Sequence, residues 1–180
     1  GKTTALAALV GRINESSERV ILTVEDPVEY VHRPRRSVVA HCALGDDVAS
    51  YAAALHGFMR ADPDVILVGE MRERETMEAA LSAAETGHLV LSTLHTSDAP
   101  QTIDRIVDAF PSDAQAQIRT QLAGTLLAVV SLRLVPARAG GRVLAGEVLV
   151  ATDAVRAMIR DGKTHQLRNA SLAGRAAGMQ

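Results

Sequence analysis

The chain has 180 residues, of which 47% are hydrophobic, enough for one domain with a buried core. Its 19 basic and 21 acidic side chains leave a net charge of -2, which disfavours a surface for nucleic acid or anionic membrane. The single cysteine, Cys42, excludes an intrachain disulfide, and beside His41 it offers at most a pair of metal ligands, so we expect no zinc site. We therefore expect a single domain over residues 1–180.

The chain begins with GKTT, the second half of the phosphate-binding signature G-x-x-x-x-G-K-S/T. Apolar residues then recur at helical spacing, at Leu6, Leu9, Val10 and Ile13. A phosphate loop leads into a helix whose N-terminal N–H groups attract anions, so this order favours a nucleotide site. On this interpretation the preceding strand and the first part of the loop are missing. We expect the isolated chain to bind ATP poorly and to be inactive.

Helical and strand-like segments alternate along the first half of the chain. Strands are expected at Val20–Val24, Val65–Val68 and Leu89–Leu94, because runs that are apolar on both faces are typical of buried parallel strands. Helices are expected between them, at Val48–Met59 and Glu73–Thr86. Strands alternating with helices predict the α/β class with a largely parallel sheet.

The second half of the chain predicts C-terminal helices and a β-hairpin. Gly140-Gly141 is typical of the turn between two strands, and Thr152 can cap a last helix that Gly162 ends. From Asn169 onward the pattern is weak, and we predict no element there. The expected bounds are Ala99–Ala109 and Asp113–Leu127 for the helices, and Val129–Val135 and Arg142–Val150 for the strands.

Polar residues follow or flank the three strands predicted in the first half. Glu25 and Asp26 follow the first strand, Glu70 follows the second, and His88 and His95 bracket the third. Each pattern by itself also fits a polar loop or a structural histidine. Ligands of parallel sheets bind at the carboxyl ends of the strands, so we expect one site that collects a lysine, a threonine hydroxyl, these carboxylates and both imidazoles. That set suits phosphoryl transfer to water.

Four segments carry a resemblance to a known family: ILTVEDPVEYVH, DPDVILVGEMR, ETGHLVLSTLHTSDAPQTIDRIVDAFP and AVRAMIRD. They are similar to the hexameric ATPases of type IV pili and type II secretion, and most of all to the pilus retraction ATPases, the PilT family. The resemblance covers nearly the whole chain. It implies a RecA-like P-loop core, ATP and Mg²⁺, a hexameric ring, an inner-membrane pilus platform protein as partner, and a place at the cytoplasmic face of the inner membrane.

The resemblance also implies roles for single residues. Lys2 would contact the β- and γ-phosphates, and Glu25 would be the general base that orients the attacking water. Glu70 would act through the metal, and His88 and His95 would sense the γ-phosphate and the neighbouring subunit. The expected catalytic residues are Glu25, Glu70 and His95, the nucleotide-binding residues are Gly1, Lys2, Thr3, Thr4, His88 and His95, and the Mg²⁺ ligands are Thr3 and Glu70.

The chain departs from the family pattern at 39–43, where an arginine of the usual run is absent. On this resemblance we expect the 180 residues to hold the ATPase domain without the family's N-terminal domain. Assembly and secretion relatives usually insert a four-cysteine zinc loop, so a single cysteine favours retraction and thus twitching motility. A pilus assembly or type II secretion ATPase remains the alternative. A RecA-like nucleic-acid translocase is disfavoured by the acidic balance and the scarcity of aromatic side chains. A ring subunit that does not hydrolyse ATP is disfavoured by Glu25.

Two arginine groups lie outside the predicted nucleotide-binding motifs. Arg156 and Arg160 are four residues apart, on one face of the expected last helix. They are either a solvated basic face or a contact for a partner, and we expect their replacement to leave the fold intact. Arg33, Arg35 and Arg36 suggest a solvated loop or a second partner contact.

Overall fold

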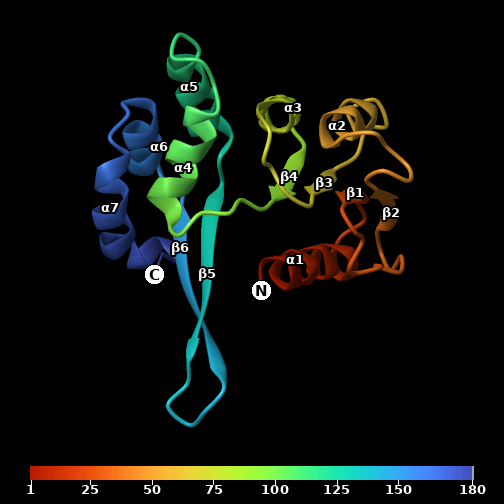
Figure 1. Ribbon diagram of the computed structural model, residues 1–180, viewed down its shortest axis with the longest axis horizontal. Helices are drawn as coiled ribbons and strands as arrows, with labels where there is room; N and C mark the ends of the chain where they lie inside the picture. The colour runs from red at the N-terminus through yellow and green to blue at the C-terminus, as the bar shows by residue number, and fades with distance from the viewer. Residues whose placement is uncertain (180) are drawn as a thin grey trace. The chain divides into compact units, whose positions relative to one another are not determined.

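The computed structural model describes residues 1–179. Its internal contacts divide the chain into a first unit, Lys2–Leu94, and a second unit that begins at His95 (Figure 1). The first unit carries a parallel sheet between helices, and the second carries a β-hairpin with helices. The predicted α/β class is therefore confirmed. A single domain over residues 1–180 stays a prediction.

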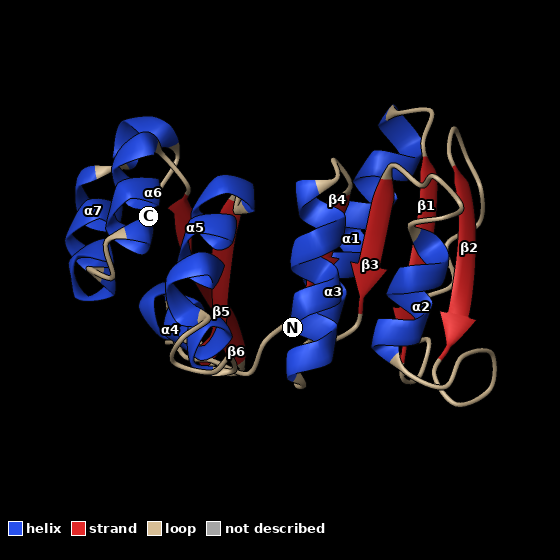
Figure 2. Cartoon of the chain, turned by 90° about the horizontal axis from the view of Figure 1, so that it is seen from above, coloured by secondary structure: helices blue, strands red, loops and turns tan. Residues whose placement is uncertain are grey.

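Four parallel strands form the sheet of the first unit, in the order β2-β1-β3-β4 (Figure 2). The three predicted strands all form, and the two predicted helices form between them. The strands are β1 (Val20–Glu25), β2 (Val38–Ala43), β3 (Val65–Val68) and β4 (Leu89–Ser92), and the helices are α1 (Lys2–Ser16), α2 (Tyr51–Phe58) and α3 (Arg74–Glu85).

The β2 strand was not predicted. It lies at the edge of the sheet and pairs along its whole length with β1, from Val20 opposite Val38 to Glu25 opposite Ala43. None of its residues is fully buried, because β2 pairs with a neighbouring strand along only one of its edges. Its mixed sequence therefore lacks the continuous apolar run that marks a central strand.

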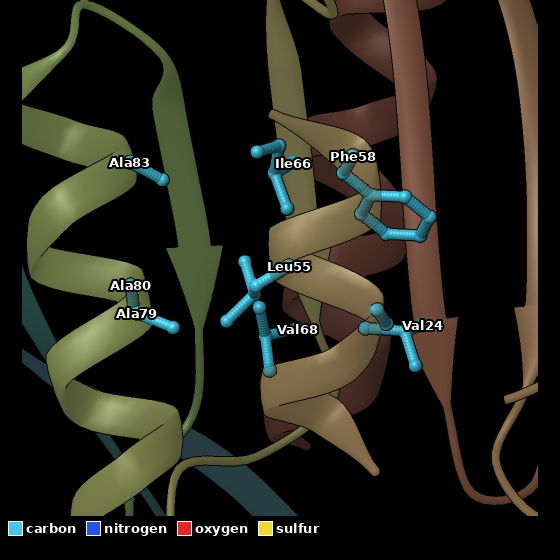
Figure 3. Packing of buried hydrophobic residues seen from close by; sticks show 9 residues of the cluster. Val24, Leu55, Phe58, Ile66, Val68, Ala79, Ala80 and Ala83 are labelled. Carbon is cyan, nitrogen blue, oxygen red and sulfur yellow. The ribbon is translucent and has the colours of Figure 1, made fainter. Parts of the chain in front are cut away.

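The central strand β3 is apolar throughout because both of its faces are covered. Ile66 and Val68 point to the face where α2 and α3 pack, together with Leu55 of α2 (Figure 3). Val65 and Leu67 pack on the opposite face, against Val10 of α1. Burying a side chain of this size contributes roughly 1.5–3 kcal/mol. The two clusters fix α1 on one face and α2 and α3 on the other.

Side chains also bind main-chain groups at the amino ends of the strands. Asp64 accepts a hydrogen bond from the N–H of Val20 at 2.8 Å and pairs with Arg19 at 2.6 Å. Asn14, a buried residue of α1, donates to the carbonyl of Arg33 at 2.9 Å and accepts from the N–H of Arg35 at 3.0 Å. The basic loop is thus held through its backbone, and its arginine side chains are exposed.

The second unit contains the predicted hairpin and helices. The strands pair antiparallel, from Ala128 opposite Val150 to Pro136 opposite Arg142. Thr152 caps the helix that follows, and Gly162 has a φ of 72°, which favours glycine. The elements are α4 (Ala99–Asp108), α5 (Gln115–Thr125), β5 (Ala128–Pro136), β6 (Arg142–Val150), α6 (Asp153–Arg160) and α7 (Leu167–Ala173), with 3-10 turns at Thr164–Gln166 and Arg175–Ala177.

One expectation for the second unit is wrong. Arg156 does not lie free on the surface of α6, because its guanidinium donates to the carbonyls of Ala123 and Gly124 at 2.5 and 2.8 Å. These carbonyls belong to the last turn of α5, where a cation is favourable. Arg156 therefore holds α5 to α6, and its replacement should weaken the fold. Arg160 is exposed, as expected.

Within residues 1–179, no helix combines the length and the apolar character that crossing a membrane requires. The α7 helix was not predicted. It buries only Leu167 and Ser171, too few residues to leave a helical pattern in the sequence.

Candidate nucleotide site

The carboxyl ends of β1 and β3 meet closely. Gly69, which follows β3, donates its N–H to the carbonyl of Val24 at 2.8 Å. A Cβ placed on Gly69 would lie 3.4 Å from the Cα of Glu25 and 3.5 Å from the hydroxyl oxygen of Tyr51. The end of β3, the backbone of Glu25 and the hydroxyl of Tyr51 therefore lie next to one another.

The end of β4 and the start of α1 lie at the same edge of the sheet. The Thr93 hydroxyl donates to the carbonyl of Gly69 at 2.7 Å, and the N–H of Met71 donates to the carbonyl of Thr93 at 3.0 Å. The ammonium of Lys2 donates to the carbonyl of Leu94 at 2.9 Å. The expectation that Lys2, Glu25 and the strand end that bears Glu70 gather at one edge agrees with these contacts.

The first residues of α1 carry the groups expected to hold phosphate. Helix α1 begins at Lys2, and the N–H groups of its first turn have no partners within the helix. Thr3 is half-buried, whereas Thr4 is exposed, with its hydroxyl 3.4 Å from that of Tyr30. Gly1 directly precedes the helix. A helix start with free N–H groups and a lysine can hold an anion.

Glu25 is a buried carboxylate at the end of β1, with a relative exposure of 7%. One of its oxygens, Oε1, accepts a hydrogen bond from the hydroxyl of Thr23 at 3.1 Å. Burial raises the pKa of Glu25 above its usual value, and the Glu29 carboxylate adds to the rise. The Thr23 hydrogen bond and the nearby His41 oppose it. A buried carboxylate with a raised pKa is suited to accept a proton near neutral pH.

Glu70 lies beyond β3 and is half-buried. Its Oε2 accepts a hydrogen bond from the exposed side chain of Arg72 at 2.8 Å, a contact that an incoming cation can replace. The pKa of the Tyr51 hydroxyl is raised, first by burial and then by Glu70 and Asp26, which places that hydroxyl among carboxylates.

The residues present fit Mg²⁺ bound together with a nucleotide. Among residues 1–179, no group of three or more His, Cys, Asp or Glu side chains is arranged to hold a metal. Mg²⁺ in nucleotide sites takes one or two protein oxygens, with phosphates and waters supplying the rest. The hydroxyl of Thr3 and the carboxylate of Glu70 are oxygen ligands of this kind.

The two histidines do not gather as expected. His88 precedes β4 and so lies at the amino end of the sheet, the end opposite to Lys2 and Glu25. Its Nδ1 lies 2.9 Å from the carbonyl of Ala83 in the last turns of α3. The expectation that both imidazoles join the carboxylates at one edge is therefore wrong for His88. Its role towards a nucleotide or a neighbouring subunit stays a prediction, as does that of His95, which begins the second unit.

Sequence reasoning missed three residues around Glu25, namely Thr23, His41 and Tyr51. Thr23 is the one polar residue inside the apolar run of β1, a signal that could have been followed. Residues 39–43 alone do not indicate that His41 faces Glu25, because that contact depends on the pairing of β2 with β1.

A parallel sheet with a lysine and threonines at a helix start, and carboxylates at the neighbouring strand ends, defines a P-loop nucleotide-binding protein. A family model described as "Type II/IV secretion system protein" matches residues 1–177. The chain belongs to this family.

Named relatives agree with the family. The chain is 48% identical over 181 residues to a twitching motility protein of Neisseria gonorrhoeae, covering 100% of this chain and 48% of the relative. It is 45% identical over 180 residues to the type IV pilus retraction ATPase PilT of Pseudomonas aeruginosa, covering 100% of this chain and 52% of the relative. The chain thus spans about half the length of these relatives.

A solved structure shows the same fold. The crystal structure of the pilus retraction motor PilT with bound ADP matches with a TM-score of 0.91 and 48% sequence identity, over 97% of this chain and 50% of that one. The match confirms the RecA-like P-loop ATPase fold that the sequence predicts, with its parallel sheet and C-terminal helices.

Proposed function

We propose that the protein is the ATP-hydrolysing motor domain of a hexameric ring that drives type IV pilus retraction, and with it twitching motility. The observation that carries the proposal is the gathering of Lys2, Glu25 and the strand end of Glu70 at one edge of a parallel sheet. Similarity over the whole of this chain to about half of a retraction ATPase supports the choice of motor. On this proposal the ring acts at the cytoplasmic face of the inner membrane, against an inner-membrane pilus platform protein.

Each residue at this edge has its own role in the proposed hydrolysis of ATP. Lys2 offers its ammonium to the β- and γ-phosphate oxygens and gives up its contact with Leu94 to do so. Water attacks the γ-phosphorus, the bond from that phosphorus to the bridging oxygen breaks, and ADP leaves with the bond's electron pair. Glu25 takes the proton of the attacking water, and its raised pKa brings it closer to that of a useful base.

Thr3 and Glu70 would hold the Mg²⁺ that accompanies the nucleotide. When bound, Mg²⁺ neutralises the charge that develops on the phosphate oxygens. Glu70 would then give up its hydrogen bond from Arg72.

Two substitutions test the roles of base and phosphate contact. In the full-length protein, Glu25→Gln should leave nucleotide affinity near that of the unmodified protein and lower turnover by roughly 10²–10⁴-fold, because the amide cannot accept a proton. Lys2→Ala should instead weaken ATP binding, because it removes a charge from the bound complex. Phosphate release and titration with a fluorescent ATP analogue measure the two effects.

Glu78→Gln, an exposed change on α3, is the control. Turnover of Glu25→Gln within a few fold of the unmodified protein would show that another group is the base.

The direction of force needs a cellular readout. Cells that carry Glu25→Gln should keep surface pili and lose twitching motility if the motor retracts pili. Loss of the pili themselves would assign the motor to assembly. Loss of a secreted protein with normal pili and motility would assign it to secretion.

A further inference from the structure

Two polar side chains, Thr23 of β1 and His41 of β2, lie behind Glu25 and connect to it by hydrogen bonds. The hydroxyl of Thr23 is 3.1 Å from Oε1 of Glu25 and 2.9 Å from Nδ1 of His41. His41 is also 3.9 Å, through the same nitrogen, from Oε1 of Glu25. These contacts follow from the strand register, which places Thr23 directly opposite His41.

The contact at Nε2 of His41 decides which group donates in each of these hydrogen bonds. The backbone N–H of His32 donates to Nε2 of His41 at 3.1 Å, so Nε2 is an acceptor and carries no proton. In the neutral ring the proton is then on Nδ1, which donates it to the Thr23 hydroxyl oxygen. The Thr23 hydroxyl is left to donate its own hydrogen to Glu25. All three hydrogen bonds therefore run one way, from the main chain at His32 to the carboxylate.

Burial makes this arrangement rigid. Thr23 has no exposed surface, and the side chains of His41 and Glu25 are 15% and 9% exposed. The ring of His32 stacks on that of His41, with centroids 6.0 Å apart and an interplanar angle of 15°. Within residues 1–179, Oε2 of Glu25 accepts no hydrogen bond. One carboxylate oxygen is fixed, and the other remains for a ligand.

We propose that His41 and Thr23 are positioning residues that hold Oε1 of Glu25, so that Oε2 points at the attacking water. The inference rests on the proposed function, since it assigns the orientation of the same base. A base held in one rotamer loses less freedom on reaching the transition state, and a misplaced base costs rate without costing affinity. Turnover should therefore depend on the hydroxyl and the imidazole, and nucleotide binding should not.

The first test compares a variant that loses the Thr23 hydroxyl at constant volume with one that keeps it. Thr23→Val keeps the volume and loses the bond, whereas Thr23→Ser keeps the bond. In the full-length protein, Thr23→Val should lower kcat about tenfold, the size of one lost hydrogen bond, with KM and ADP affinity unchanged. Thr23→Ser should stay within about twofold of the unmodified protein. A loss of the same size in both variants, or an equal loss in ADP affinity, would mean a purely structural role and overturn the inference.

The second test changes the imidazole. His41→Gln can accept from the His32 N–H with its carbonyl and donate to Thr23 with its amide, and it should keep most of kcat. His41→Leu can do neither, and it should resemble Thr23→Val. The two changes combined should cost no more than either alone, because they break one connected chain. Additive losses would show that the residues act separately, contrary to the inference.

The outcome separates this inference from the function on which it rests. If Glu25→Gln keeps its turnover, the proposed base is wrong. If Glu25→Gln loses turnover while Thr23→Val and His41→Leu keep it, the base stands and only the positioning chain fails. In a Glu25→Gln background, Thr23→Val should have no further effect on residual turnover. A further loss there would also contradict the inference.

Discussion

The two ends of the four-stranded sheet use polar side chains in different ways. At the amino end, the side chains of Asp64 and Asn14 form hydrogen bonds with main-chain groups of loops and strand starts. These hydrogen bonds hold the backbone in place. At the carboxyl end, Glu70 pairs with an exposed arginine, and Lys2 binds a single carbonyl. Contacts of the second kind can be exchanged for a ligand at little cost. The amino end therefore serves stability, and on the proposed function the carboxyl end serves binding and chemistry.

Asn14→Ala gives the largest effect expected from the amino end. The change leaves the carbonyl of Arg33 and the N–H of Arg35 without their side-chain partner. The free energy of unfolding should fall by about 1–3 kcal/mol. Turnover per folded molecule should be unchanged. Urea denaturation and phosphate release measure the two quantities. The exposed Asn169→Ala is the control, expected within about 0.5 kcal/mol. A loss of turnover at a temperature where Asn14→Ala is fully folded would break the division between the two ends.

Glu25→Gln should raise the stability of the protein, whereas Asn14→Ala should lower it. The folded state raises the pKa of Glu25, so it binds the proton more tightly than the unfolded chain does. The stability from this protonation is present below the unfolded pKa and is lost as the pH rises through the folded pKa. At neutral pH the buried carboxylate thus costs stability that an amide does not. Glu25→Gln should raise the Tm by about 1–3 °C at pH 7, and this gain should shrink towards pH 4.5. A lower Tm at neutral pH would show that the Thr23 bond outweighs the cost of burial.

The sequence predicts most of the sheet and the group of residues at its carboxyl end. Strand β3 is a continuous apolar run, and β1 is interrupted only by Thr23 before it ends at Glu25. An acid stands at the end of β1 and two residues beyond the end of β3, so both the position and the direction of these strands can be predicted. The error at His88 came from counting both ends of one strand as the same edge. Residues that bracket a strand must lie at opposite ends of the sheet.

The parts that were missed depend on contacts between distant residues. Strand β2 is partly exposed, and its apolar run is interrupted by His41, so its strand signal is weak. Thr23 and His41 are 18 positions apart, and only their pairing in register brings them together. Arg156 binds carbonyls more than thirty positions earlier, and no spacing within α6 predicts that. Such contacts follow from tertiary packing and not from local periodicity.

The smallest expected effect is a change in stability on replacing Asp64, the acidic residue at the amino end of the sheet. Backbone donation from Val20, and then the Arg19 side chain, hold the pKa of Asp64 below its usual value. The stability from this shift is present above the unfolded pKa, near 3.8, and is lost as the pH falls through the lower folded pKa. Asp64→Asn should therefore be less stable than the unmodified protein at pH 7, by less than Asn14→Ala, and the difference should close below about pH 3.8. Thermal unfolding between pH 3 and pH 8 measures the difference, and turnover at pH 7 should be unchanged. A difference that stays constant over this range would mean that Asp64 holds the strand starts by its hydrogen bonds alone, with no contribution from its charge.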